Sequence, residues 1–383
     1  MNAAALPAPD SILLVATRQI GDVLLTTPLL RSLRRAYPAA AIDVLVYTDK
    51  GGMLAGNPDC REVIETDEHP DFKGYLRLLR RVLRRYDLAV TVQANDRGHA
   101  LAWLAGRRRV GIVPDRTRRS AWKRGSCARW TVLDNVYTHT VVQNLRLTDA
   151  LGIPRCHEVV PPSPRALASD MIPSVPYAVV HAFPMWRYKR WVREGWVALL
   201  RHLRERDLRV VLTGGPAAEE REFCSGLAAE FGSDVTNLAG ALDFGSISAL
   251  LRGAACFIGP DTAVTHQAAA CGIPVVAIYG PTNPVKWGPW PVACTQDPSP
   301  WQMRQHPWQQ SGNVILVQGI AECLPCREEG CERHKQSYSR CLDDLPAQVV
   351  CDAVDTALGH VGARGASHPI EFLRSPRQWP DSR

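Results

Sequence analysis

The chain has 383 residues, of which 46% are hydrophobic and 22% charged; these are values typical of soluble globular proteins, and the length suggests two domains. No apolar run approaches the roughly 18 residues that a membrane-spanning helix needs. The N-terminus lacks the basic n-region of a secretory signal and carries Asp10 just before its first apolar run, so we expect a cytoplasmic protein.

The net charge of +7 is unevenly distributed. Between Lys73 and Arg129 there are 16 Lys and Arg residues against three acids, and Trp103, Trp122 and Trp130 are interleaved with them. A solvated helix face explains most runs of this kind. So concentrated an excess also fits a polyanionic partner, which could be nucleic acid, anionic lipid headgroups or a phosphorylated glycan.

Strand-like apolar runs alternate with helical patterns along the first half of the chain. We expect strands at residues 11–16, 42–47, 88–93 and 108–113, and helices at residues 22–36, 75–86 and one that ends within 147–154. The strand runs are apolar throughout rather than alternating, as strands buried on both faces are. This order predicts an α/β fold with a doubly wound parallel sheet.

A segment with six prolines between residues 154 and 176 then indicates an interdomain connection. Alternation resumes with expected strands at residues 177–183, 209–215, 256–259, 275–280 and 314–319, and a last helix near 345–358. We therefore expect Rossmann-like domains at residues 1–160 and 177–360, a linker at 161–176 and a mobile tail at 361–383. Two such domains facing one another would place their strand ends on a shared cleft, where these folds bind ligands.

The first candidate motif is "ATRQIGDVLLTTP", which contains Gly21 at a strand-to-helix turn and Asp22 where the helix begins. Asp22 could cap that helix, a contribution of about 1 kcal/mol. It could instead be a carboxylate at the mouth of the cleft that acts as a general base. Gly21 would let the backbone pass close to a ligand. The motif alone leaves both interpretations open.

Two further motifs follow strands of the second domain. Lys189 and Arg190 are placed either to meet a phosphate in the cleft or to lie on a solvated loop. In "LTGGPAAEE", Glu219 or Glu220 falls near a helix start. One of these two glutamates could hydrogen-bond a ribose diol, or it could only complement the helix dipole. The sequence does not indicate which of the two glutamates would contact the ribose.

The stretch from residue 256 to residue 290 presents a helix N-terminus between two apolar runs. Thr262 is a good N-cap for a helix over residues 263–271, which Gly272 and Pro274 end. The free amides of its first turn would face the cleft and could bind a diphosphate. His266, one turn in, could reach a phosphate or satisfy a core carbonyl. Together with Lys286 in the next loop, these residues predict a nucleotide-diphosphate site.

Four of the twelve cysteines form a C-x2-C-x4-C-x9-C cluster: Cys323, Cys326, Cys331 and Cys341. In a cytosolic chain such a cluster favours metal binding over disulfides, although the spacing matches no standard zinc module. A structural zinc ion is therefore a hypothesis for this cluster. A closed four-thiolate site would not be catalytic.

Several of these motifs resemble those of a known family. Residues 19–38, 189–191, 212–216, 237–242 and 259–289 are similar to the bacterial heptosyltransferases of glycosyltransferase family 9, and the resemblance covers about residues 11–358. It implies a GT-B fold of two Rossmann-like domains, with acceptor bound mainly to the first and nucleotide-sugar donor to the second. It also implies transfer of L-glycero-D-manno-heptose from ADP-heptose to the inner core of lipopolysaccharide, with inversion of the anomeric centre.

The resemblance assigns roles to particular residues. Asp22 matches the family's proposed general base, and Lys189 matches the lysine that contacts donor phosphates. The expected donor-binding set is Lys189, Glu219, Asp261, Thr262, Ala263 and His266, with Ala263 standing where the family often has glycine. Gly21 and three basic residues form the expected acceptor-binding set: Gly21, Arg97, Arg119 and Lys123. The sequence has no Asp-x-Asp pair, so we expect catalysis without a metal or other cofactor.

The expected partners are ADP-heptose and a phosphorylated lipopolysaccharide inner core, with the basic first domain held peripherally at the cytoplasmic face of the inner membrane. A family member that uses another nucleotide-sugar or glycan acceptor is one alternative. A non-catalytic nucleotide- or nucleic-acid-binding protein is another, but a mere binder has no need for Asp22, Lys189 and Thr262 in one cleft. The strand runs also lack the stacking aromatics that a nucleic-acid-binding sheet uses, so we expect no nucleic acid partner. The sequence does not indicate the oligomeric state.

Overall fold

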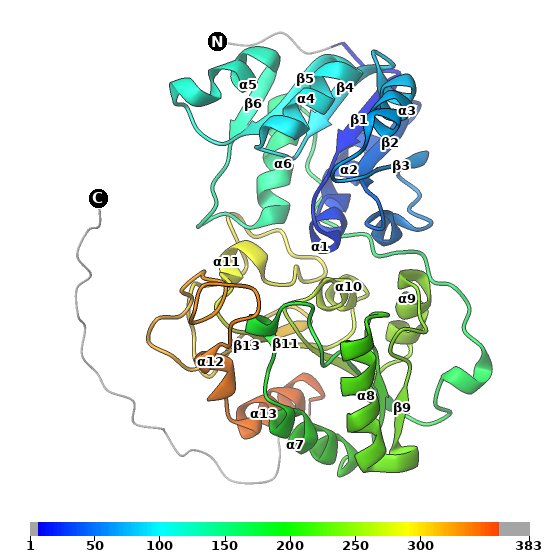
Figure 1. The fold of residues 1–383 in the computed structure, drawn as a ribbon, viewed down its shortest axis with the longest axis vertical. Coiled ribbons are helices and arrows are strands. Elements are labelled where there is room, and N and C mark those ends of the chain that lie inside the picture. Colours follow the sequence, from blue (N-terminus) through cyan, green and yellow to red (C-terminus); the bar gives the residue numbers. More distant parts are fainter. Residues whose placement is uncertain (1–6, 360–383) are drawn as a thin grey trace.

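The computed structural model describes residues 7–359, which form two α/β domains, each built on its own sheet (Figure 1). The expected mobile tail at residues 361–383 lies outside this range. Among the helices of residues 7–359, none combines the length and hydrophobicity required to span a bilayer.

The first domain contains a six-stranded sheet in the order β3-β2-β1-β4-β5-β6, with all neighbours parallel. Its strands are β1 (Ser11–Val15), β2 (Ala41–Tyr47), β3 (Glu62–Thr66), β4 (Tyr86–Thr91), β5 (Gly106–Val113) and β6 (Arg129–Val132). The strand order reverses direction between β1 and β4. Ligands of open α/β sheets bind at such a switch point, outside the carboxyl ends of the strands.

Helices cover both faces of this sheet. One face packs against α1 (Ile20–Leu24), α2 (Thr27–Ala36) and α6 (Thr140–Leu151). The other packs against α3 (Phe72–Val82) and α4 (Asp96–Ala105), with α5 (Ala121–Ser126) beside α4. Short 3₁₀ helices lie at η1 (Gly51–Leu54) and η2 (Arg118–Ser120).

Two helix predictions in this domain were wrong in their boundaries. The single helix expected over residues 22–36 is two helices, α1 and α2, that meet at Leu25 and Thr26. Pro28 has no amide hydrogen and fits only the first turn of a helix, so a new helix begins there. The helix expected to reach residue 86 ends at Val82, and Tyr86 instead opens β4.

The second domain contains a seven-stranded sheet in the order β12-β13-β11-β10-β7-β8-β9, parallel except for the β12–β13 pair. Its strands are β7 (Tyr177–Val180), β8 (Arg209–Leu212), β9 (Val235–Asn237), β10 (Cys256–Pro260), β11 (Val275–Tyr279), β12 (Trp308–Ser311) and β13 (Val314–Gln318). The order reverses between β7 and β10, which repeats the arrangement of the first sheet. Its switch point is therefore the expected place for a ligand.

Helices also cover both faces of the second sheet. One face packs against α7 (Arg193–Arg204), α8 (Ala218–Phe231) and α13 (Ala347–Ala357), and the other against α9 (Phe244–Arg252) and α10 (Ala263–Ala270). The remaining short elements are α11 (Pro284–Trp287), α12 (Arg340–Asp343), η3 (Ser169–Met171), η4 (Arg187–Lys189) and η5 (Gly232–Asp234).

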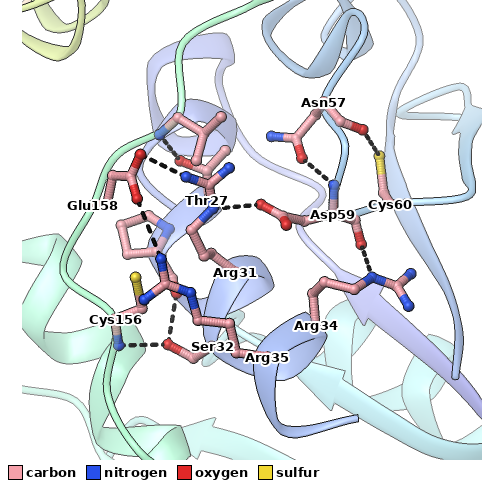
Figure 2. Close-up of polar contacts among 12 residues, drawn as sticks. Thr27, Arg31, Ser32, Arg34, Arg35, Asn57, Asp59, Cys60, Cys156 and Glu158 are labelled. Atoms are coloured by element: carbon pink, nitrogen blue, oxygen red, sulfur yellow. Dashed lines mark hydrogen bonds and ion pairs between the residues drawn. The ribbon is translucent and has the colours of Figure 1, made fainter. Parts of the chain in front are cut away.

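The proline-rich connection between α6 and β7 is held by hydrogen bonds to the first domain. Figure 2 shows it against α2, where Arg31 forms an ion pair with Glu158 at 2.5 Å and also contacts Asp59 at 2.8 Å. Two backbone amides of the connection donate to α2 hydroxyls: Cys156 N to Ser32 Oγ at 2.8 Å, and Val160 N to Thr27 Oγ1 at 2.9 Å. These contacts fix where the chain leaves the first domain.

Direct contacts also join the two domains. A Cβ atom built on Gly21 would lie 3.6 Å from Ala263 Cα, so the starts of α1 and α10 face each other. The loop before α6 docks on the second domain: Lys286 Nζ donates to the Asp134 carbonyl at 3.1 Å, and His139 Nε2 lies 2.7 Å from the Gly288 carbonyl oxygen. The carboxyl ends of both sheets therefore face one cleft.

Candidate active site

A cavity of about 750 Å³ lies in this cleft and is lined by both domains. Its volume falls in the range of about 300–1,000 Å³ that small-molecule sites occupy. The lining comes from loops that follow β1, β7, β8, β10 and β11, and includes Gly21, Asp22, Lys189, Glu220, Asp261, Thr262, Ala263 and His266.

Asp22 is the acidic side chain that the first domain contributes to this cavity. It is the third residue of α1, whose N-cap position is occupied by Gln19, so the interpretation of Asp22 as the N-cap was wrong. Its side chain is 11% exposed, and Arg18 Nε lies 3.2 Å from Oδ1. Burial raises the pKa of the Asp22 carboxyl, against the opposing charges of Arg18, Lys286 and Lys189. A buried carboxylate with a raised pKa is suited to accepting a proton.

Across the cavity, Lys189 of η4 and Asp261 after β10 form a buried ion pair with Nζ 2.6 Å from Oδ2. Burial opposes the charge on both groups, but the Lys189 ammonium holds the pKa of Asp261 below its usual value, and Asp261 raises the pKa of Lys189. Lys189 therefore stays charged while it lines the cavity.

The N-terminus of α10 opens onto the same cavity. Thr262 occupies the N-cap position as expected, but its hydroxyl contacts Thr265 Oγ1 at 3.2 Å and does not cap a backbone amide. The first-turn amides are thus left without a side-chain cap, and with the helix dipole they favour an anion.

His266, on the first turn of α10, lines the cavity as a neutral side chain. Burial lowers its pKa to about 4. Its Nδ1 atom has no hydrogen-bond partner within residues 7–359. It can therefore contribute a hydrogen bond to a ligand rather than a positive charge.

The structure places Glu220, not Glu219, in the cavity. The Glu220 side chain is 12% exposed and accepts a hydrogen bond from the Gly215 amide, and burial raises its pKa. Glu219 is 69% exposed and forms an ion pair with Arg190 at 2.6 Å. The sequence contains a pattern that distinguishes the two glutamates. Glu220 is on the same face of α8 as three buried residues at three- and four-residue spacing: Cys224, Leu227 and Phe231.

Four residues were expected to bind the acceptor. In the structure of residues 7–359, Gly21 is the one of these four that lines the cavity. Arg97 donates to the Asp67 carbonyl at 2.7 Å, and Lys123 is buried against Asp96 at 2.8 Å. Arg119 is exposed on η2. These three residues belong to the helices and loops that cover one face of the first sheet, outside the cavity, and their role in acceptor binding stays a prediction.

Sequence reasoning missed one wall of the cavity. Arg327, Glu328 and Glu329 line it, and they belong to the loop that contains the cysteine cluster. This loop is tied to the segment that carries Lys189, since Ser339 Oγ donates to the Tyr188 carbonyl at 2.6 Å. No local motif marks these residues, because their position depends on the path of a long loop.

The four clustered cysteines line a second pocket, of about 410 Å³. All four are free thiols, and Cys341 is the buried member of the set. Within residues 7–359 there is no group of three or more His, Cys, Asp or Glu side chains arranged to hold a metal ion. Zinc binding at this cluster stays a prediction, which metal analysis of protein purified under reducing conditions would test.

The sequence model of glycosyltransferase family 9 (heptosyltransferase) matches residues 75–336. The chain belongs to this family. It is 30% identical over 288 residues to lipopolysaccharide heptosyltransferase 3 of Escherichia coli, a match that covers 70% of this chain and 83% of that one. It is 28% identical over 292 residues to lipopolysaccharide heptosyltransferase 1 of Pseudomonas aeruginosa, covering 71% and 79% of the two chains.

Solved structures with the same fold include E. coli ADP-heptose lps heptosyltransferase II, with a TM-score of 0.66 at 20% identity over 91% of this chain and 98% of that chain. E. coli heptosyltransferase WaaC with ADP gives a TM-score of 0.67 at 20% identity, covering 91% and 99% of the two chains. The GT-B fold is therefore confirmed. As a member of glycosyltransferase family 9, the protein is a glycosyltransferase.

Proposed function

We propose that this glycosyltransferase moves heptose from ADP-L-glycero-D-manno-heptose to the inner core of lipopolysaccharide, with inversion at the anomeric carbon. One observation carries the proposal: a buried carboxylate from the first domain, Asp22, lines the same cavity as the cation and helix N-terminus of the second domain, Lys189 and α10. The names of the relatives supply the sugar and the acceptor.

In this mechanism Asp22 is the general base. It takes the proton from the acceptor hydroxyl as that oxygen bonds to the anomeric carbon, while the bond from that carbon to the diphosphate oxygen breaks on the opposite face. The raised pKa of Asp22 makes it a stronger base than an exposed aspartate. A positioned base of this kind contributes about 10²- to 10⁴-fold to rate.

The departing diphosphate would be stabilised by fixed groups of the second domain. Lys189 supplies a permanent positive charge, and the uncapped amides of α10 supply oriented donors. Neutral His266 would add a hydrogen bond, and Glu220 would accept one from the ribose hydroxyls. We propose that no metal is required, since the sequence lacks an Asp-x-Asp pair and these groups can carry the charge.

We further propose that the enzyme attaches peripherally to the cytoplasmic face of the inner membrane, where a lipid-anchored acceptor would be reached. The competing function within this fold is transfer from another nucleotide-sugar, because the diphosphate site itself does not select the sugar.

A ligand panel tests the donor assignment. A ligand that binds only the folded state raises apparent stability, so thermal shifts should rank ADP-heptose above ADP-glucose and the UDP-sugars. Incubation with ADP-heptose and a core acceptor that lacks heptose should then give a product heavier by one heptose, with inverted anomeric configuration by NMR. Product formation should persist in EDTA. A larger shift with a UDP-sugar, or retained configuration, would contradict the proposal.

A further inference from the structure

The outer side of the helices on one face of the first sheet carries an exposed apolar stripe. The inner side of α3 is buried through Leu78 and Val82. On its outer side Phe72 is 76% exposed and Leu83, just past the helix end, is 49% exposed, with Leu76 exposed between them. These positions recur at helical spacing, so they lie along one side of α3 that the protein's own core does not use.

Basic side chains lie beside this stripe. The exposed set on and just after α3 consists of Lys73, Arg77, Arg80, Arg81, Arg84 and Arg85. Arg81 pairs with Glu62, whereas Arg77 and Arg80 form no ion pair with any residue of the described chain. Arg77 and Arg80 lie next to the apolar stripe, on the side of α3 opposite to the buried residues Leu78 and Val82. The helix therefore has a buried side, an exposed apolar side and a basic side.

Two tryptophans extend the apolar area to the neighbouring helices. Trp103 of α4 is 47% exposed, and the Arg84 guanidinium lies 5.4 Å from its ring centre. Trp122 of α5 is also exposed and packs edge-on against His99 of α4, with ring centres 6.0 Å apart. We call the exposed apolar and basic residues of α3, α4 and α5 the α3–α5 surface; these helices lie together in the upper part of Figure 1.

This surface is separate from the donor site, since none of its exposed apolar or basic residues lines the interdomain cavity. Exposed apolar side chains that gather beside basic residues mark an interaction site rather than ordinary surface. Two occupants fit poorly. A second copy of the same surface would bring like charges together, and nucleic acid would leave the exposed leucines of the α3 stripe, Leu76 and Leu83, without a partner.

We propose that the α3–α5 surface docks on an anionic lipid bilayer, with Phe72, Leu76 and Trp103 entering the headgroup boundary. An amphipathic helix with basic residues beside an apolar side lies in the interface plane, and its arginines bind anionic headgroups. The inference deepens the proposed peripheral attachment by naming the surface. It needs neither donor nor acceptor, so it can fail without the transfer reaction failing.

Vesicle co-sedimentation of the full chain tests the charge component. The protein should bind phosphatidylcholine vesicles that contain phosphatidylglycerol more tightly than vesicles of phosphatidylcholine alone, and salt should weaken the binding. Loss of two surface arginines in Arg77→Gln/Arg80→Gln should weaken binding about 30-fold. The matched control is Arg201→Gln/Arg252→Gln, which removes the same charge from exposed positions of the second domain.

A second pair of variants tests the apolar component. Phe72→Ser/Leu76→Ser should lower binding to the anionic vesicles, and Phe72→Ser alone, at a side chain that is 76% exposed, should lower it without a change in melting temperature. Val175→Ser changes an exposed apolar residue elsewhere and should bind like the unmodified protein. Equal binding by the α3 variants and their controls would overturn the proposal, as would binding to an acidic protein or RNA but not to vesicles. Vesicle binding without heptosyl transfer would contradict only the proposed function.

Discussion

Replacing Asp22 with Asn should stabilise the folded protein at neutral pH and remove most of its turnover. The carboxyl of Asp22 is buried, and that burial raises its pKa above the ordinary value of 3.8. Ionising the group at neutral pH therefore costs more in the folded protein than in the unfolded chain. An Asn side chain has nearly the same shape and carries no charge, so it avoids that cost without leaving a cavity.

The sign of the effect sets its pH dependence. Well below 3.8, Asp22 is protonated in both states and the variant should have no advantage. As pH rises, the unfolded chain loses this proton first, so the free energy of unfolding of the unmodified protein falls relative to that of the variant. Above the raised pKa of the folded state, the difference stays constant.

The magnitude follows from two opposing contributions. Each unit by which burial raises the pKa of Asp22 lowers the free energy of unfolding at neutral pH by about 1.4 kcal/mol. The substitution also removes the ion pair with Arg18, but the Arg18 side chain is 37% exposed, and such pairs contribute only about 0–1 kcal/mol. Burial therefore decides the sign. Loss of the proposed base should at the same time lower kcat about 10²- to 10⁴-fold.

Chemical denaturation at neutral pH and at about pH 3, below the ordinary pKa of 3.8, with turnover measured at neutral pH, tests both effects. The denaturation midpoint of Asp22→Asn should exceed that of the unmodified protein, and by more at neutral pH. Glu205→Gln, at an exposed carboxylate in the second domain, should change neither midpoint nor turnover. A variant less stable than the unmodified protein at neutral pH would refute the burial argument, and near-normal turnover would refute the role as a base.

Three further predictions concern the second domain. Glu220→Gln should weaken ADP binding about tenfold or more by calorimetry, since hydrogen bonds to a charged group are the stronger ones, whereas Glu219→Gln at its exposed neighbour should leave it unchanged. Lys189→Met should lower the free energy of unfolding by about 3–5 kcal/mol because it leaves the buried Asp261 carboxylate without its cation, and adding Asp261→Asn should restore part of the loss. Lys286 does not line the cavity, but its charge lowers the pKa of Asp22, so Lys286→Met should move the acidic limb of the kcat/KM–pH profile to higher pH.

The sequence predicts the interior of both sheets but not their edges. Each of the nine expected strands corresponds to a strand of the structure, whereas β3, β6, β9 and β12 were not expected. These four strands form the outer edges of the two sheets. Their sequences are short and mixed in polarity, such as "EVIET" and "WQQS", because an edge strand is only partly buried. The uniform apolar pattern that marks central parallel strands is therefore missing at the edges.

The same division holds for the site. Asp22, Lys189 and the 261–266 segment could be placed from the sequence, because each follows a central parallel strand and the fold carries strand ends to one cleft. Arg327 and Glu329 could not, because a long loop brings them to the cavity. The positions of Arg97 and Lys123 could not be predicted either. The sequence shows that basic residues are dense in this region, but not that contacts with Asp67 and Asp96 hold these two side chains away from the cleft.

The two ion pairs of the cleft would link substrate binding to the basicity of Asp22. Asp22 is paired with Arg18, and Asp261 with Lys189, so each carboxylate is held by a cation from its own domain. In the proposed function, a donor diphosphate would form an ion pair with Lys189, and an anionic group of the acceptor would form one with Arg18. Because Arg18 lowers the pKa of Asp22, moving it toward the acceptor would raise that pKa. In the proposed mechanism Asp22 would then be a stronger base when the acceptor hydroxyl is in place, whereas before acceptor binds the ion pair with Arg18 compensates its charge.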